Sequence, residues 1–100
     1  MILTIDIGNT NIVLGGFDDE KLRFISRIST NAKKTDAEYA TKLKSILSLY
    51  GVDESEVSGA AISSVVPILT QTMANAIKIV FKVRIINNKL EGVLIYEIRK

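Results

Sequence analysis

The 100-residue sequence contains no cysteine and no histidine. Without cysteine, a disulfide framework, a thiolate metal site and a cysteine nucleophile are all excluded. Without histidine, the chain lacks the commonest general base and the commonest zinc ligand. Any proton transfer must use Asp, Glu, Lys or Tyr, or a group supplied from outside the chain. Chemistry that needs little acid–base help, such as phosphoryl transfer, stays open.

The sequence also lacks long apolar runs and a large excess of one charge. No apolar stretch approaches the roughly 18 residues of a transmembrane helix, so we expect no membrane partner. The chain starts Met1–Asp6, with an acid where a signal peptide would continue its apolar block, which predicts a cytoplasmic protein. The net charge is +2 and the 13 basic residues are scattered, so we expect no nucleic-acid partner.

The residues that are present suit one folded domain. Apolar residues make up 47% of the chain, which is enough for a hydrophobic core and far from a disordered composition. The length leaves room for one domain, so residues 1–100 are expected to form a single unit. A domain of this size buries roughly 60–70% of its unfolded surface, and it can therefore fold alone with little margin.

Hydrophobic alternation predicts three strands at the start of the chain. Residues 2–7 place apolar side chains on one face, and Thr4 and Asp6 on the other. Residues 12–17 and 22–28 also read as strands and follow after short polar segments, which predicts an antiparallel meander. Because Asp6 alternates in register with Thr4 and an isoleucine, we expect its carboxylate to be partly buried.

A first helix is expected after this meander. Thr35-Asp36-Ala37-Glu38 fits a capping box, and Gly51 suits the end of the helix. Tyr39 and Tyr50 fall on the apolar stripe at helical spacing, so both are expected in the core.

The second half of the chain predicts a strand, a helix and further strands. Residues 59–66 are small and apolar, which indicates a buried strand parallel to the first, and Pro67 suits the first position of a helix. Residues 83–86 indicate another strand that Asn87-Asn88 breaks, and residues 93–98 a last one. The predicted order is β-β-β-α-β-α-β plus this final strand, an α/β fold with a mixed sheet.

The segment Asp6-Ile7-Gly8-Asn9-Thr10-Asn11 carries the clearest chemical signal. A carboxylate at a strand end projects over the turn, and a glycine lets a phosphate approach the backbone closely. Successive amides in such a turn form an anion-binding concavity, and Mg²⁺ bridges a carboxylate to phosphates. The alternative is a plain β-hairpin, because Asn and Gly are the ordinary residues of tight turns.

Two other polar segments allow two interpretations each. Ser63 and Ser64 either line a cleft at the carboxyl end of their strand, where ligands gather in α/β sheets, or only lead into the next helix. Lys33 and Lys34 either steer phosphate toward the turn or belong to a solvated loop.

Three segments, in order, resemble the type III pantothenate kinases. Asp6-Ile7-Gly8-Asn9-Thr10-Asn11 looks like the first phosphate motif of that family. Ser29-Thr30 followed by Lys34-Thr35-Asp36-Ala37-Glu38 resembles the stretch after its third strand. Ile62-Ser63-Ser64-Val65-Val66-Pro67 resembles its segment between strand and helix. The resemblance covers residues 1–82, and the three segments together are more specific than the first alone.

The resemblance implies a fold, an activity and a set of site residues. These kinases belong to the acetate kinase, sugar kinase and actin superfamily, whose domains have a ribonuclease H-like core. The chain would be the N-terminal lobe of a two-lobed kinase that phosphorylates pantothenate with ATP, the first step of coenzyme A synthesis. Mg²⁺ would lie near Asp6, held through water. The residues that the resemblance assigns to ATP are Asp6, Ile7, Gly8, Asn9, Thr10, Asn11, Ile12 and Val13.

The sequence departs from the family where the family's catalytic group lies. That group is the Asp of a Gly-Ala-Asp-Arg motif, which does not occur here. The family's ligands for a monovalent cation, potassium or ammonium, would also lie outside this chain. We therefore assign no catalytic residue and expect no catalysis by the 100 residues alone. The alternative is a regulatory or assembly module on the same fold, which would form a homodimer through its helices or a strand edge.

Overall fold

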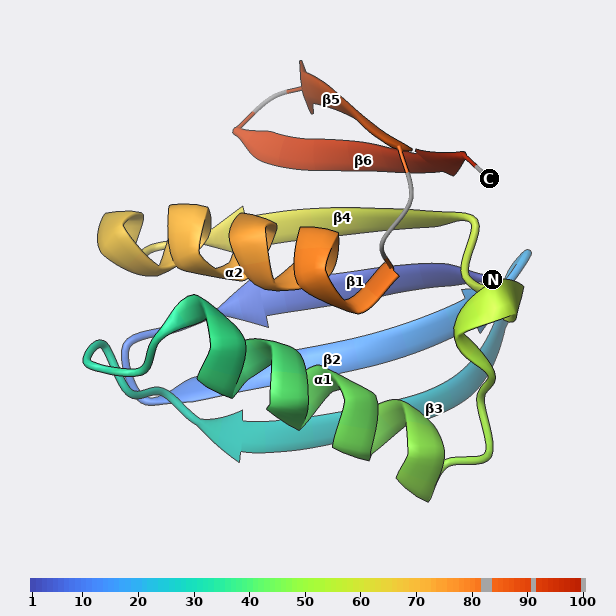
Figure 1. Ribbon diagram of the computed structural model, residues 1–100, viewed down its shortest axis with the longest axis horizontal. Coiled ribbons are helices and arrows are strands. Elements are labelled where there is room, and N and C mark those ends of the chain that lie inside the picture. The colour runs from blue at the N-terminus through green and yellow to red at the C-terminus, as the bar shows by residue number, and fades with distance from the viewer. Residues whose placement is uncertain (82–83, 91, 100) are drawn as a thin grey trace.

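The computed structural model describes residues 1–81, 84–90 and 92–99, which form one six-stranded sheet and two helices (Figure 1). The strand order across the sheet is β3-β2-β1-β4-β6-β5. The elements are β1 (Ile2–Ile7), β2 (Asn11–Asp18), β3 (Lys21–Ser29), α1 (Asp36–Leu49), the 3₁₀ turn η1 (Glu54–Glu56), β4 (Gly59–Ser64), α2 (Pro67–Phe81), β5 (Arg84–Leu90) and β6 (Val93–Arg99).

The first four strands pair as the sequence predicts. β2 runs antiparallel to both β1 and β3, which confirms the meander. β4 lies on the other side of β1 and runs parallel to it. The carboxyl ends of β1 and β4 therefore meet at one edge of the sheet, and both helices begin at that same edge (Figure 1).

Both helices pack on one face of the sheet, where Leu3, Ile5 and Ile7 of β1 are at most 1% exposed (Figure 1). α1 has the predicted capping box, in which Thr35 and Glu38 bond to each other's backbone N–H groups. Gly51 follows the helix at φ 69°, as expected of a helix stop. The inner face of α2 is buried. Its buried side chains include Leu69, Met73, Ile77 and Val80.

The two tyrosines of the predicted apolar stripe differ. Tyr39 is 1% exposed, as predicted, but Tyr50 is 44% exposed, so its assignment to the core was wrong. Tyr50 is the C-cap residue at the end of α1, and its ring stacks on that of Phe24 with the ring centroids 5.0 Å apart.

The opposite face of the sheet carries no helix in the part of the chain that the structure describes. Ile2 and Ile25 on this face are 44% and 58% exposed. Asp6 lies on the same face and is exposed, so the predicted partial burial of its carboxylate was wrong. Alternation puts a residue on a face but does not say whether another layer covers that face.

The last two strands form an antiparallel hairpin. β6 pairs with β4, and β5 lies at the edge of the sheet. β5 continues through Asn87-Asn88, so the predicted break there was wrong, while β6 confirms the predicted last strand. Asn88 is exposed, and an edge strand accepts polar side chains that a central strand would have to bury. Residues 82, 83 and 91, including the predicted start of the earlier strand, lie outside the described residues.

None of the described helices is both long and apolar enough to cross a membrane.

Candidate functional site

The predicted phosphate turn joins β1 to β2 at the carboxyl edge of the sheet. Gly8, Asn9 and Thr10 lie between the two strands, directly after the last residue of β1. The backbone N–H of Val65, which follows β4, donates to the carbonyl of Ile7 at 3.0 Å. The turn is therefore fixed to both parallel strands, beside the positive ends of two helix dipoles.

The hydrogen bonds of the turn engage its carbonyls more than its amides. The N–H of Gly8 donates to the carbonyl of Asn11 at 2.9 Å. Thr30 donates to the Thr10 carbonyl through its N–H and to the Gly8 carbonyl through its hydroxyl, at 2.9 and 2.8 Å. The N–H groups of Asn9, Thr10 and Asn11 have no acceptor within residues 1–81, 84–90 and 92–99. Three successive donors are thus available to an anion.

Asp6 supplies the negative charge beside these donors. Its register partners are Val13 on β2 and Ser63 on β4, and the side chains of Asp6 and Ser63 are both exposed. No group of three or more acidic, His or Cys side chains that could hold a metal ion occurs among the described residues. A cation at Asp6 would need further ligands from a bound molecule. This donor set fits Mg²⁺ carried by phosphates, which commonly binds through one or two carboxylates and water.

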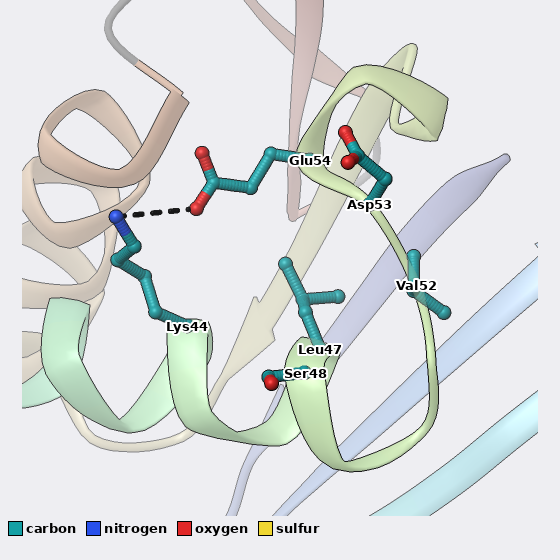
Figure 2. A pocket seen from close by; sticks show the side chains of 6 residues that line it. All are labelled: Lys44, Leu47, Ser48, Val52, Asp53 and Glu54. Atoms are coloured by element: carbon teal, nitrogen blue, oxygen red, sulfur yellow. Dashed lines mark ion pairs between the residues drawn. The ribbon is translucent and has the colours of Figure 1, made fainter.

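The opposite edge of the sheet has more charged side chains but fewer polar groups without a protein partner. A cavity of about 280 Å³ lies between α1 and the segment around η1, where Lys44 Nζ and Glu54 Oε1 are 3.3 Å apart (Figure 2). Arg23 bonds to Asp18 and Glu56 at 2.8 and 3.3 Å. The guanidinium of Arg23, as the main cause, lowers the pKa of Asp18 below its usual 3.8. The charges of Arg23, Asp18 and Glu56, and those of Lys44 and Glu54, are thus paired with one another, as in a structural network.

A sequence model of the type III pantothenate kinase family matches residues 2–94. The chain belongs to this family. A type III pantothenate kinase of Finegoldia magna is 51% identical over 78 residues, which make up 78% of this chain and 30% of that protein. One from Roseiflexus sp. is 42% identical over 83 residues, 83% of this chain and 32% of the relative. One from Moorella thermoacetica is 42% identical over 77 residues, 77% of this chain and 30% of the relative.

Membership of the type III pantothenate kinase family confirms the predicted fold class. The mixed sheet with two helices agrees with the N-terminal half of the actin-like ATPase fold. The chain spans about 30% of the length of the relatives it matches. Their activity therefore belongs to proteins about three times as long.

The segment predicted to bind phosphate mixes core and surface residues in this structure. Ile7 and Ile12 are 0% exposed, so their side chains belong to the core and only their backbone borders the turn. Val13 is half-buried beside Asp6. A Cβ added at Gly8 would lie 3.1 Å from the Asn11 carbonyl oxygen, so the hairpin itself favours a small residue there.

Ser64 has the structural role that one of the two sequence interpretations predicts. Its hydroxyl accepts from the N–H of Val66 and donates to the Val66 carbonyl, both at 3.0 Å. It also lines a cavity of about 240 Å³ together with Thr70 and Lys89. Ser63 is instead exposed beside Asp6, where it is open to a ligand.

The two lysines after β3 differ in their surroundings. Lys33 is exposed, and Lys34 Nζ lies 5.7 Å from the centroid of the Tyr39 ring. This cation–π geometry directs Lys34 toward α1, while the exposure of Lys33 agrees with the interpretation of a solvated loop.

Thr30 and Lys89 lie on the same side of the sheet as the candidate site, and the sequence did not indicate either of them. Thr30 lay inside a matching segment, but nothing in its local pattern indicated that it bonds to a turn 20 residues earlier. A polar β-branched residue directly after the third strand of a meander was the available signal. Lys89 lies in β5, whose position beside the cavity depends on the last hairpin.

Proposed function

We propose that this chain supplies the nucleotide-phosphate half of a site that phosphorylates pantothenate with ATP. The observation that carries the proposal is the turn at residues 8–11, with three amides that lack protein acceptors and an exposed carboxylate at Asp6. The phosphates of ATP would accept from the amides of Asn9, Thr10 and Asn11. Family membership supports ATP as the phosphate donor and pantothenate as the acceptor.

Asp6 has a role that the other residues of the turn cannot fill. A carboxylate beside bare phosphates would repel them, but it would hold a hydrated Mg²⁺ that accompanies ATP. When bound, the ion neutralises phosphate charge. Ser63 lies next to Asp6 in the register and offers a hydroxyl to the same water shell.

The catalytic group would come from outside these 100 residues. No carboxylate other than Asp6 lies in the turn, and the family's Gly-Ala-Asp-Arg motif is absent from the sequence. The chain would be one lobe of a two-lobed cytoplasmic kinase for the first step of coenzyme A synthesis. The second lobe would supply the monovalent-cation site and close the cleft. A sensitive turnover assay with ATP and pantothenate should detect no product, and clear turnover by the purified chain would refute this part of the proposal.

Calorimetric titration with Mg-ATP and with metal-free ATP tests the assigned role of Asp6. Asp6→Asn should weaken Mg-ATP binding by about tenfold, the equivalent of one charge-assisted hydrogen bond. The same substitution should leave metal-free ATP binding unchanged or tighter, because it removes a like charge. The matched control is Asp19→Asn, an exposed acid in the β2–β3 turn at the other edge of the sheet. Equal losses in both variants would contradict the site assignment.

A second candidate function is an assembly module. It is favoured by the uncovered face of the sheet, where Ile2, Ile25 and Ile95 are exposed. A second copy of the chain packed against this face would form a homodimer. Light scattering across a concentration series tests it, and a strict monomer would exclude this candidate.

A further inference from the structure

Thr30 makes two hydrogen bonds to the phosphate turn from the end of the neighbouring strand. Its backbone N–H donates to the Thr10 carbonyl at 2.9 Å, and its hydroxyl donates to the Gly8 carbonyl at 2.8 Å. The two acceptors are not successive residues, so Thr30 spans the turn. Its side chain is half-buried, and Thr30 is not among the residues assigned to ATP.

These two bonds fix the orientation of two peptide planes. In a planar trans peptide, the C=O of one residue and the N–H of the next point in opposite directions. Since the Gly8 carbonyl points toward Thr30, the N–H of Asn9 points away from it. Since the Thr10 carbonyl also accepts from Thr30, the N–H of Asn11 points away as well. Thr30 therefore turns two of the three open amides to the same side.

The Thr30 hydroxyl also competes with an ordinary turn bond. In a regular β-turn the carbonyl of the first residue accepts from the N–H of the fourth. Here those residues are Gly8 and Asn11, and the reverse bond, from Gly8 N–H to the Asn11 carbonyl, is the one that forms. The Gly8 carbonyl accepts from the Thr30 hydroxyl instead. This leaves the N–H of Asn11 available.

Thr30 is itself held by the core. The next residue, Asn31, donates its N–H to the Tyr39 hydroxyl at 3.0 Å and accepts from the same hydroxyl at 2.9 Å. Tyr39 is on α1 and is 1% exposed. A buried side chain therefore fixes the backbone next to Thr30, and a rigid support of this kind is what a preorganised anion site needs.

We propose that Thr30 is a positioning residue that keeps the amides of Asn9 and Asn11 turned outward for phosphate. Its consequence for ligand binding rests on the proposed function, but the orientation of the amides does not. Side-chain substitutions test only the bond from the hydroxyl to the Gly8 carbonyl, because the N–H of Thr30, which bonds to the Thr10 carbonyl, is kept in every substitution except proline.

Amide hydrogen exchange of the ligand-free protein tests the orientation. In Thr30→Val the Gly8 carbonyl is free to accept from Asn11, so the Asn11 amide should exchange about fivefold more slowly. Thr30→Ser keeps the hydroxyl and should exchange as the wild type does. The control is Thr41→Val, whose hydroxyl bonds only within α1, to the Ala37 carbonyl at 3.0 Å. An Asn11 amide that exchanges equally fast in Thr30→Val and the wild type would overturn the proposal.

Titration with Mg-ATP tests the consequence for binding. Thr30→Val should bind about tenfold more weakly, Thr30→Ser should restore the affinity, and Thr41→Val should not change it. Equal affinities of Thr30→Val and the wild type would refute the positioning role. A wild type that binds no Mg-ATP would refute the proposed function instead, and the exchange measurement would still decide the orientation. If Thr30→Val fails to fold, Tyr39→Phe, which removes the hydroxyl that holds Asn31, should weaken binding in the same direction, and unchanged binding would overturn the proposal.

Discussion

The two edges of the sheet differ in whether their polar groups have protein partners. At the amino end of β1, the N-terminal ammonium donates to the Glu56 carbonyl at 2.8 Å, and Arg23 bonds to Asp18 and Glu56. At the carboxyl end of β1, the amides of the turn are open and Asp6 is exposed. At the first edge the polar groups bond to one another and stabilise the fold. At the second edge they are available to a ligand.

This difference separates a structural network from the proposed binding site. Charge alone would favour the amino edge, because the amino end of β1 has more ion pairs and a cavity of about 280 Å³. The carboxyl edge instead has backbone donors without a protein acceptor, which are available to water or to an anion. Substitutions at the amino edge should therefore change stability and leave Mg-ATP binding unchanged. Substitutions at the carboxyl edge should change binding more than stability.

The largest effect is expected from Gly16→Ala, at the amino edge. A Cβ at Gly16 would lie 2.4 and 2.7 Å from two ring atoms of Phe24 and 2.9 Å from the Met1 sulfur. The Phe24 ring is stacked on Tyr50 and has little room to move. Overpacking of this kind costs about 1–3 kcal/mol in the free energy of unfolding. Urea denaturation should show this loss, while Mg-ATP affinity under folding conditions stays as in the wild type.

Gly8→Ala is the matched substitution at the carboxyl edge. The added Cβ would meet only the Asn11 carbonyl oxygen, at 3.1 Å, which has to shift by a few tenths of an ångström. The loss of unfolded-state entropy offsets part of this strain, so stability should fall by less than about 1 kcal/mol. Mg-ATP affinity should fall by about fivefold, as for one weakened hydrogen bond. A stability loss as large as that of Gly16→Ala would break the comparison.

The smallest effect is expected from Arg23→Gln, on how the stability of the protein depends on pH in acid. The pKa of Asp18 is lowered mainly by Arg23, and that of Glu56 by the Asp53 backbone N–H and then by Arg23. A lowered pKa stabilises the fold above the usual values of 3.8 and 4.5, and this contribution disappears as the pH falls through the lowered values.

Arg23→Gln should therefore lower the urea midpoint at pH 7 slightly and leave it unchanged near pH 2. The effect is small because the groups are exposed and screened by salt. A difference that persists at pH 2 would mean that packing of the arginine stem, rather than its charge, supports this edge.

The sequence was sufficient for the elements that local rules determine. Alternation placed the first three strands, the capping box at Thr35 placed α1, and Pro67 placed the start of α2. The parallel pairing of β1 and β4 followed from a small apolar strand after a helix. The strands and the helix starts each depend on residues within a few positions of one another.

The features that the sequence did not predict depend on distant parts of the chain. The exposure of Asp6 follows from an uncovered sheet face, and that of Tyr50 from its C-cap position at the end of α1. Continuation of β5 through Asn87-Asn88 follows from pairing with β6. The bonds from Thr30 to Gly8 and Thr10 form across two hairpins. The periodicity of apolar residues does not indicate contacts between distant parts of the chain. The assignment of residues 6–13 to ATP remains a prediction.

Amide chemical-shift mapping with Mg-ATP tests whether the turn at residues 8–11 binds nucleotide phosphate. We expect saturable shifts at Asn9, Thr10 and Asn11, and none around Lys44 and Glu54 at the opposite cavity. The Asp6→Asn protein should show the same pattern at about tenfold higher concentration of Mg-ATP. Absence of shifts in the turn, or shifts confined to the cavity at Lys44, would contradict the claim that this turn binds nucleotide phosphate.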